Sequence, residues 1–119
     1  NTDYSKFESY AEFDYSYKNP DKYKVVKNMY DFKEYSKYSK EIKDVKKEYK
    51  YSKTDERKSA IFNYIDGLDL DVGQKLFLYK DAGYSIKDYK KEMFDYIDNL
   101  NVSKNEKTRI WNYIYGGDL

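Results

Sequence analysis

Apolar residues recur along this chain at spacings of three and four, the period of an amphipathic helix. The clearest run spans residues 31–49 and contains Phe32, Tyr35, Tyr38, Ile42, Val45 and Tyr49. No segment shows the strict alternation that is typical of a strand, and each break in the pattern falls at a capping or helix-ending residue. The pattern therefore predicts an all-α fold of about six or seven helices.

The N-terminal half divides at two breaks. Residues 1–18 carry one broad apolar stripe, capped by Thr2 or Asp3 and made of Tyr4, Phe7, Tyr10, Ala11, Phe13 and Tyr17. Pro20 suits the first turn of a new helix, with Asn19 as its N-cap. Asp31 and Glu34 have the spacing of a capping box at the start of a third helix. The sequence leaves open whether the second and third helices are continuous.

The C-terminal half repeats itself with a period of 32 residues. Residues 61–80 and 93–112 share six of twenty positions, and most of the others keep their chemical type. A period of this length is typical of two-helix units that bury their apolar faces by stacking. We therefore predict one helical domain over residues 1–119, with an N-terminal helical arm (1–53) and two tandem helical hairpins (54–119).

Each copy of the repeat has the same predicted layout. A first helix ends at a residue in the left-handed conformation, Gly67 or Asn99, and an apolar plug follows it. The plugs are Leu68 and Leu100. A capping pair then opens the second helix, and these pairs are Asp71 with Gln74 and Ser103 with Glu106. Thr54 is the predicted cap of the first hairpin, and Ser85 with Asp88 opens the second.

Composition disfavours an enzyme. The chain has no cysteine and no histidine, so it lacks thiol chemistry, the commonest general base and the commonest metal ligand. Asp66, Asp69 and Asp71 lie close together in sequence, but the second copy has Asn101 and Ser103 in place of the last two. Those replacements keep the ability to cap a helix and lose the charge. We therefore predict no catalytic residue, no metal and no cofactor.

Charge is dense and balanced, with 23 basic and 22 acidic residues. Seventeen tyrosines and a large excess of lysine over arginine have two explanations, which are compatible. Codon usage in an AT-rich genome favours these residues, and tyrosine is also enriched in protein contact surfaces. We predict a protein-interaction module whose partner contacts are tyrosines at helix ends. The candidates are Tyr51, Tyr84 and Tyr115.

The alternative is a small nucleic-acid-binding domain. Residues 33–53 hold eight lysines against four acids, and the candidate contacts are Lys37, Lys40, Lys43 and Lys47. Neighbouring tyrosines could stack on bases. The balanced net charge and the presence of only Arg57 and Arg109 argue against it. The acids on the same helix, and the lack of any apolar run of about 20 residues, argue against a membrane role.

Three phrases of the sequence resemble a known kind of module. They are residues 13–23 (FDYSYKNPDKY), 64–70 (YIDGLDL) followed by Gln74-Lys75, and 96–102 (YIDNLNV) followed by Glu106-Lys107. They resemble a helical module near the C-terminal end of very large proteins encoded by prophages and other mobile elements of low-GC Gram-positive bacteria. The resemblance implies a module that acts by contact, in the cytoplasm of a bacterial host or associated with a virion. The first residue, Asn1, suits a module excised from a longer protein, and the resemblance leaves structural and inhibitory roles open.

Overall fold

A computed structural model describes residues 7–116, and within this part of the chain all regular secondary structure is helical, with no strands. Its helices are α1 (Tyr10–Lys18), α2 (Pro20–Met29), α3 (Phe32–Glu48), α4 (Thr54–Asp66), α5 (Val72–Asp81), the short 3₁₀ helix η2 (Lys87–Tyr89), α6 (Lys90–Asp98) and α7 (Lys104–Tyr115). The predicted all-α class is confirmed. The chain breaks between α2 and α3 because Tyr30 is extended, with φ −140° and ψ 156°.

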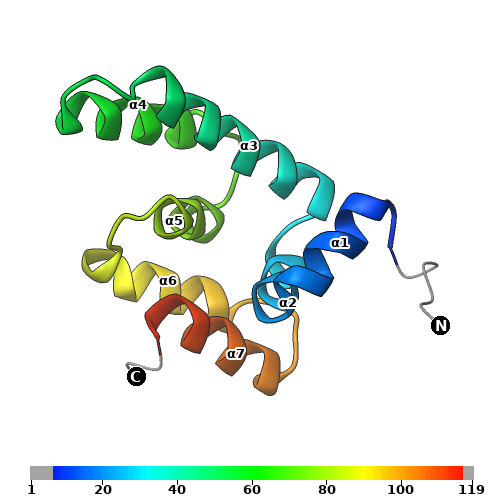
Figure 1. Ribbon diagram of the computed structural model, residues 1–119. Coiled ribbons are helices and arrows are strands. Elements are labelled where there is room, and N and C mark those ends of the chain that lie inside the picture. Colours follow the sequence, from blue (N-terminus) through cyan, green and yellow to red (C-terminus); the bar gives the residue numbers. More distant parts are fainter. Residues whose placement is uncertain (1–6, 117–119) are drawn as a thin grey trace.

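The helices form a closed circuit of contacts. Each helix from α2 to α7 packs against the next, and α7 packs back against α2. In Figure 1 the α3–α4 pair lies above α5, the α6–α7 pair lies below it, and α1 and α2 lie to one side. Residues from the N-terminal arm and from both hairpins therefore share one core.

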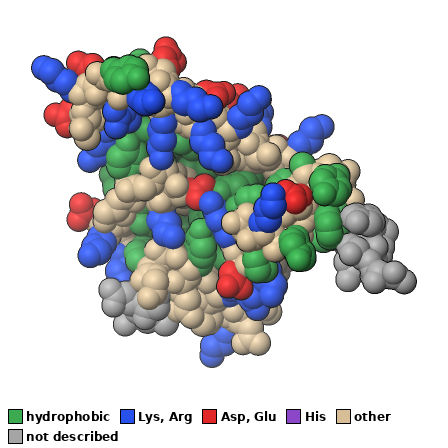
Figure 2. All heavy atoms as spheres, viewed as in Figure 1, with side chains coloured by type: hydrophobic (Ala, Val, Ile, Leu, Met, Phe, Trp, Pro, Cys, Tyr) green, Lys and Arg blue, Asp and Glu red, His purple; other side chains and the backbone are tan. Residues whose placement is uncertain are grey.

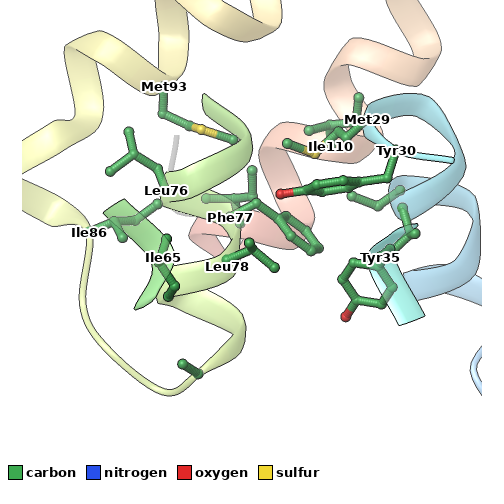
Figure 3. Close-up of a cluster of buried hydrophobic side chains, with 14 of the residues drawn as sticks. Met29, Tyr30, Tyr35, Ile65, Leu76, Phe77, Leu78, Ile86, Met93 and Ile110 are labelled. Atoms are coloured by element: carbon green, nitrogen blue, oxygen red, sulfur yellow. The ribbon is translucent and has the colours of Figure 1, made fainter. Parts of the chain in front are cut away.

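The core is centred on α5, whose apolar residues Leu76, Phe77 and Leu78 are almost completely buried. Figure 3 shows Phe77 pointing towards Tyr30 and Tyr35. The ring centroid of Phe77 lies 6.0 Å from that of Tyr30 and 6.1 Å from that of Tyr35. Phe77 also stacks on Tyr113 of α7 with centroids 5.9 Å apart, so rings from α3 and α7, together with Tyr30, pack against α5.

Several predicted helix ends are confirmed by their hydrogen bonds. Asp71 and Gln74 form the predicted reciprocal capping box. The Ser103 hydroxyl accepts a hydrogen bond from the Glu106 backbone N–H at 3.2 Å. The Asp31 carboxylate also caps its helix, but it accepts from the backbone N–H of Lys33. Of these three predicted boxes, the Asp71–Gln74 pair forms in full, whereas Ser103 and Asp31 each cap their helix through one side-chain hydrogen bond.

Other predicted ends are wrong. Gly67 and Asn99 have φ −76° and −88°, so both are right-handed. A lysine explains the difference, because the Lys75 ammonium donates to the Asp66 carbonyl at 2.8 Å and Lys107 donates to Asp98 in the same way. The terminal carbonyl is thereby satisfied without a left-handed residue.

Two predicted starts are also displaced. Thr54 is the first residue of α4, whose N-cap is Lys53 without a side-chain hydrogen bond. Ser85 precedes η2, so α6 itself begins only at Lys90. Thr2 and Asp3, the predicted caps of the first helix, lie outside the described residues, and α1 is capped by Ser9.

The α4–α5 and α6–α7 hairpins make matching contacts 32 residues apart. Phe62 and Tyr79 pack edge to face with centroids 4.9 Å apart, and Phe94 and Trp111 pack in the same way at 4.9 Å. The two lysine-to-carbonyl bonds described above have the same offset. Duplication of the hairpin remains a prediction from sequence. These contacts show that the two hairpins place equivalent residues in similar contacts.

Candidate protein-binding pocket

A pocket of about 650 Å³ opens where the end of α5, the start of α6 and the end of α7 meet. Its wall includes two of the predicted tyrosines together with three lysines. The lining residues are Lys80, Gly83, Tyr84, Ser85, Ile86, Lys87, Lys90, Ile114 and Tyr115. Ile86 and Ile114 belong to the buried core, so the base of the pocket is apolar.

Two glycines shape the pocket. Gly83 has φ 103° and ends the turn after α5, which returns the chain so that the Tyr84 N–H donates to the Tyr79 carbonyl at 3.0 Å. Gly116 has φ 62° and ends α7 directly after Tyr115. Residues with a side chain rarely adopt these angles, so glycine at both positions sets the path of the chain at the pocket.

The aromatic wall of the pocket is held by packing. The Tyr84 ring lies 4.9 Å from Phe62, and the Tyr115 ring lies 4.4 Å from Trp111. The Tyr115 hydroxyl is buried and has no hydrogen-bond partner within the described residues. Its burial, and then the negative charge of Glu92, raise the pKa of Tyr115 above its usual value. This hydroxyl therefore stays neutral and keeps its hydrogen-bond donor.

The three lysines give the pocket a positive charge. None of its lining residues is acidic, and no ion pair to Lys80, Lys87 or Lys90 occurs in the part of the chain described. The Lys80 ammonium lies 4.1 Å from the ring centroid of Tyr113. Burial lowers the pKa of Lys80, and Lys22 lowers it further against the opposing effect of Asp81. The Lys80 ammonium thus lies on a ring that is not part of the pocket lining, and Lys87 and Lys90 are the exposed lysines of the pocket.

The third predicted tyrosine stands apart from the other two. Tyr51 is 93% exposed and lies in the connection between α3 and α4. Figure 1 shows that this connection and α7 lie at opposite sides of the molecule. The Lys50 ammonium lies 5.4 Å from the centroid of the Tyr51 ring. The structure thus brings Tyr84 and Tyr115 to one pocket and leaves Tyr51 isolated.

The lysines of the alternative site are all exposed along α3. They are Lys37, Lys40, Lys43 and Lys47. Figure 2 shows blue Lys and Arg side chains over the α3–α4 edge, with red acidic side chains among them. Of the neighbouring rings, Tyr35 is 1% exposed and Tyr38 is half-buried. The buried Tyr35 ring cannot stack on a base, whereas Tyr51, which follows α3, is 93% exposed and is the most open ring of this segment.

Two of the three acidic residues considered for chemistry have structural partners. Asp71 belongs to the capping box, and the Asp66 carboxylate accepts a hydrogen bond from the Tyr79 hydroxyl. Among the described residues no cluster of three or more acidic side chains is arranged to hold a metal ion. Within the same residues no helix is both long and apolar enough to cross a membrane.

Sequence reasoning missed the lysines of the pocket. Lys80 precedes Gly83, while Lys87 and Lys90 follow it, so a cluster of lysines around a helix-ending glycine was the available signal. Tyr115 approaches this cluster only because of how α7 packs in the fold. A pattern of residues close together in sequence does not predict that packing. Comparison of the chain with protein-family models, with curated proteins and with solved structures finds no match.

Proposed function

We propose that this chain is a non-enzymatic protein-interaction module that binds an acidic segment of a partner protein in the Tyr84–Tyr115 pocket. The observation that carries the proposal is the combination of three lysines, two tyrosines and an apolar base in a pocket without acidic residues. Aromatic anchors beside desolvated charges are typical of the residues that dominate protein interfaces. The sequence resemblance adds that the module belongs to a phage or mobile-element protein. In that setting its role is either structural or inhibitory.

Charge reversal tests the proposal. The Lys87→Glu/Lys90→Glu variant changes two exposed lysines of the pocket, and Lys40→Glu/Lys43→Glu is its matched control on α3. The probe is a short fluorescent peptide of alternating Glu and Leu, titrated by anisotropy at low and at high salt. We expect the pocket variant to lose at least about tenfold in affinity, and the control to lose much less, because only the first places like charges beside the peptide.

The tyrosines provide a second measurement. Tyr84→Ala and Tyr115→Ala remove packed rings, so each should lower both peptide affinity and the free energy of unfolding by about 1–3 kcal/mol. Tyr51→Ala should change unfolding by less than about 0.5 kcal/mol and leave peptide affinity unchanged, because its ring is exposed. Absence of peptide binding to the unmodified chain at micromolar concentration would sink the proposal.

The same charge-reversal variants also test the alternative function, nucleic-acid binding by α3. Labelled single-stranded DNA and RNA replace the peptide, again at two salt concentrations. Salt-sensitive binding that Lys40→Glu/Lys43→Glu removes and the pocket variant retains would assign nucleic-acid binding to α3 and would overturn the acidic-peptide proposal.

A further inference from the structure

A second, separate groove of about 270 Å³ lies between α6 and α7. Phe94, Ile97 and Trp111 supply its apolar surface, while Asp98, Lys104 and Lys107 form its polar edge together with Thr108. Phe94 is 53% exposed, and it is the only phenylalanine among the exposed large hydrophobic residues of the described part of the chain. Comparison with the first hairpin explains why the Phe94 ring is exposed.

The first hairpin contains the same groove in a covered form. A pocket of about 240 Å³ between α4 and α5 is lined by residues 32 positions earlier, among them Phe62, Asp66, Lys75 and Tyr79. This covered groove has an additional wall that the open one lacks. The additional wall is a later segment of the chain, from which Tyr84, Ser85, Ile86 and Tyr89 reach the pocket.

The two phenylalanines show what the covering segment does. Phe62 lies between two rings, since Tyr79 and Tyr84 each approach it edge to face at 4.9 Å. Phe94 has the counterpart of the first contact, with Trp111 at 4.9 Å. The position 32 residues after Tyr84 is Gly116, which has no side chain to supply the second ring. Phe62 is consequently half-buried where Phe94 is exposed.

The covering segment has a definite chemistry. It follows the helix-ending Gly83 and places Tyr84 on Phe62 and Ile86 in the core, with Ile86 only 5% exposed. Tyr89, at the end of η2, closes the far side of the covered groove. Its pattern is therefore tyrosine, any residue, isoleucine, two further residues and tyrosine.

We propose that the groove between α6 and α7 binds a partner polypeptide segment of the pattern Tyr-x-Ile-x-x-Tyr, docked as residues 84–89 dock on the first hairpin. The inference goes beyond the acidic-peptide pocket, because it concerns another surface and another ligand chemistry. The incoming ring packs on Phe94 beside Trp111, and the aliphatic side chain enters the apolar part of the groove. Such a site recognises the leading segment of a further hairpin of this type.

The chain provides its own reporter, because Trp111 is its single tryptophan. The probe is a blocked peptide with the sequence of residues 83–90, which contains no tryptophan. We expect saturable binding to the full chain, with a small blue shift of the Trp111 emission, because its ring is only 6% exposed before the peptide covers the groove. A control peptide with serine in place of both tyrosines and the isoleucine should produce no shift.

Two matched variants locate the binding surface. Phe94→Ser removes the exposed ring of the open groove and should lower peptide affinity at least about tenfold. Val72→Ser removes a side chain of similar exposure, 54%, from the covered groove and should leave affinity unchanged. Circular dichroism of both variants confirms that they are folded. Unchanged affinity of Phe94→Ser would overturn the proposal.

Other occupants of the groove give different results. A chain ending at Gly116 should bind the peptide as the full chain does, whereas tighter binding together with a red-shifted Trp111 would assign the groove to residues 117–119. Emission that shifts with protein concentration in the absence of peptide would assign it to a second copy. Lys87→Glu should weaken binding of the acidic peptide and retain this peptide's affinity, so failure here and failure of the acidic-peptide proposal are distinguishable.

Discussion

At the scale of single residues, Glu12 shows how a charged side chain can face the core. It is 1% exposed on α1, where its carboxylate accepts hydrogen bonds from the Tyr23 hydroxyl at 2.5 Å and the Glu8 backbone N–H at 3.0 Å. The Lys27 ammonium lies 3.3 Å from it. Burial alone would raise the pKa of Glu12, but these partners outweigh it and lower that pKa below 4.5.

A pH-dependent stability follows from that lowered pKa. The pKa of Glu12 is lower in the folded than in the unfolded chain, so ionised Glu12 stabilises the fold. This contribution to the free energy of unfolding is complete above about pH 4.5 and is lost as pH falls through the folded-state pKa. We expect Glu12→Gln to lower the free energy of unfolding by about 1–3 kcal/mol at neutral pH, with a smaller deficit at about pH 3. Urea titrations at both pH values measure the difference.

The exposed neighbour Glu8 supplies the control for this measurement. Glu8→Gln keeps the backbone N–H that bonds to Glu12 and should change neither value appreciably. An equal deficit of Glu12→Gln at both pH values would contradict an ionised, hydrogen-bonded Glu12.

The same residue explains where sequence analysis of α1 failed. The predicted stripe faced Tyr10 and Tyr17 inward, yet they are 72% and 79% exposed while Glu12 and Tyr15 face the core. Tyrosine carries both an apolar ring and a polar tip, so seventeen of them blur the hydrophobic pattern. The burial of Glu12 depends on Tyr23 and Lys27 in the next helix, which a stripe within one helix cannot reveal.

At the scale of secondary-structure elements, a glycine sets how closely α5 and α6 approach. A Cβ atom on Gly73 would lie 2.0 Å from Cγ of the Tyr96 ring. No such atom fits, so the ring of α6 lies directly on the backbone of α5. The corresponding residue of the second hairpin, Asn105, is exposed and meets no such ring.

We therefore expect opposite results from two glycine substitutions. Gly73→Ala should lower the free energy of unfolding by about 1–3 kcal/mol, because overpacking outweighs the intrinsic advantage of alanine in a helix, about 1 kcal/mol. Gly67→Ala should be neutral or stabilising, since its φ is −76° and its nearest neighbour would be the Asn63 oxygen at 3.4 Å. Thermal and urea unfolding of both variants measure this.

The ranking of the two variants is the decisive result. Equal stability of both would mean that α6 moves away from α5 at little cost. Strong destabilisation by Gly67→Ala alone would indicate that this position needs a left-handed residue after all.

Helix ends divide into those that sequence predicted and those that it did not. The capping pair of Asp71 and Gln74 is local, and its geometry follows from residue types three positions apart. The carbonyl at the end of α4 is instead satisfied by Lys75, nine residues later on the facing helix. Similarly, the lysines of the acidic-peptide pocket converge only through the packing of α7. The cap pair at Asp71 was therefore predictable from local residue types, whereas the starts predicted at Thr54 and Ser85 and the tertiary convergence of the pocket were not.

At the scale of the whole molecule, one carboxylate ties three helices together. Asp81 on α5 pairs with the Lys22 ammonium of α2 and accepts a hydrogen bond from the Tyr35 hydroxyl of α3 at 2.5 Å. Its side chain is 14% exposed and that of Lys22 is 26% exposed. The nearby negative charge, after burial itself, raises the pKa of Tyr35 far above its usual value, so its hydroxyl stays a donor.

Removal of this carboxylate tests whether the circuit of helices is cooperative. We expect Asp81→Ala to lower the free energy of unfolding by about 2–4 kcal/mol, because it leaves Lys22 and Tyr35 without their partner in a largely dry site. Glu48→Ala, which removes an exposed carboxylate at the end of α3, should change stability by less than about 0.5 kcal/mol. Urea unfolding followed by circular dichroism and by Trp111 emission compares them.

Agreement between the two signals is part of this expectation. If Asp81→Ala made the two transitions separate, the N-terminal arm and the hairpins would unfold independently. A loss as small as that of Glu48→Ala would show that the aromatic core alone closes the circuit.

The lysine that closes each hairpin has an evolutionary consequence. Lys75 and Lys107 satisfy the carbonyls at the ends of α4 and α6, and each belongs to the second helix of the same hairpin. The end of the first helix in such a hairpin is therefore satisfied by a side chain of the same hairpin, and no residue from a neighbouring element is needed there. A gene segment encoding it can be copied or transplanted without new compensating mutations there, and selection can then act on the surfaces alone.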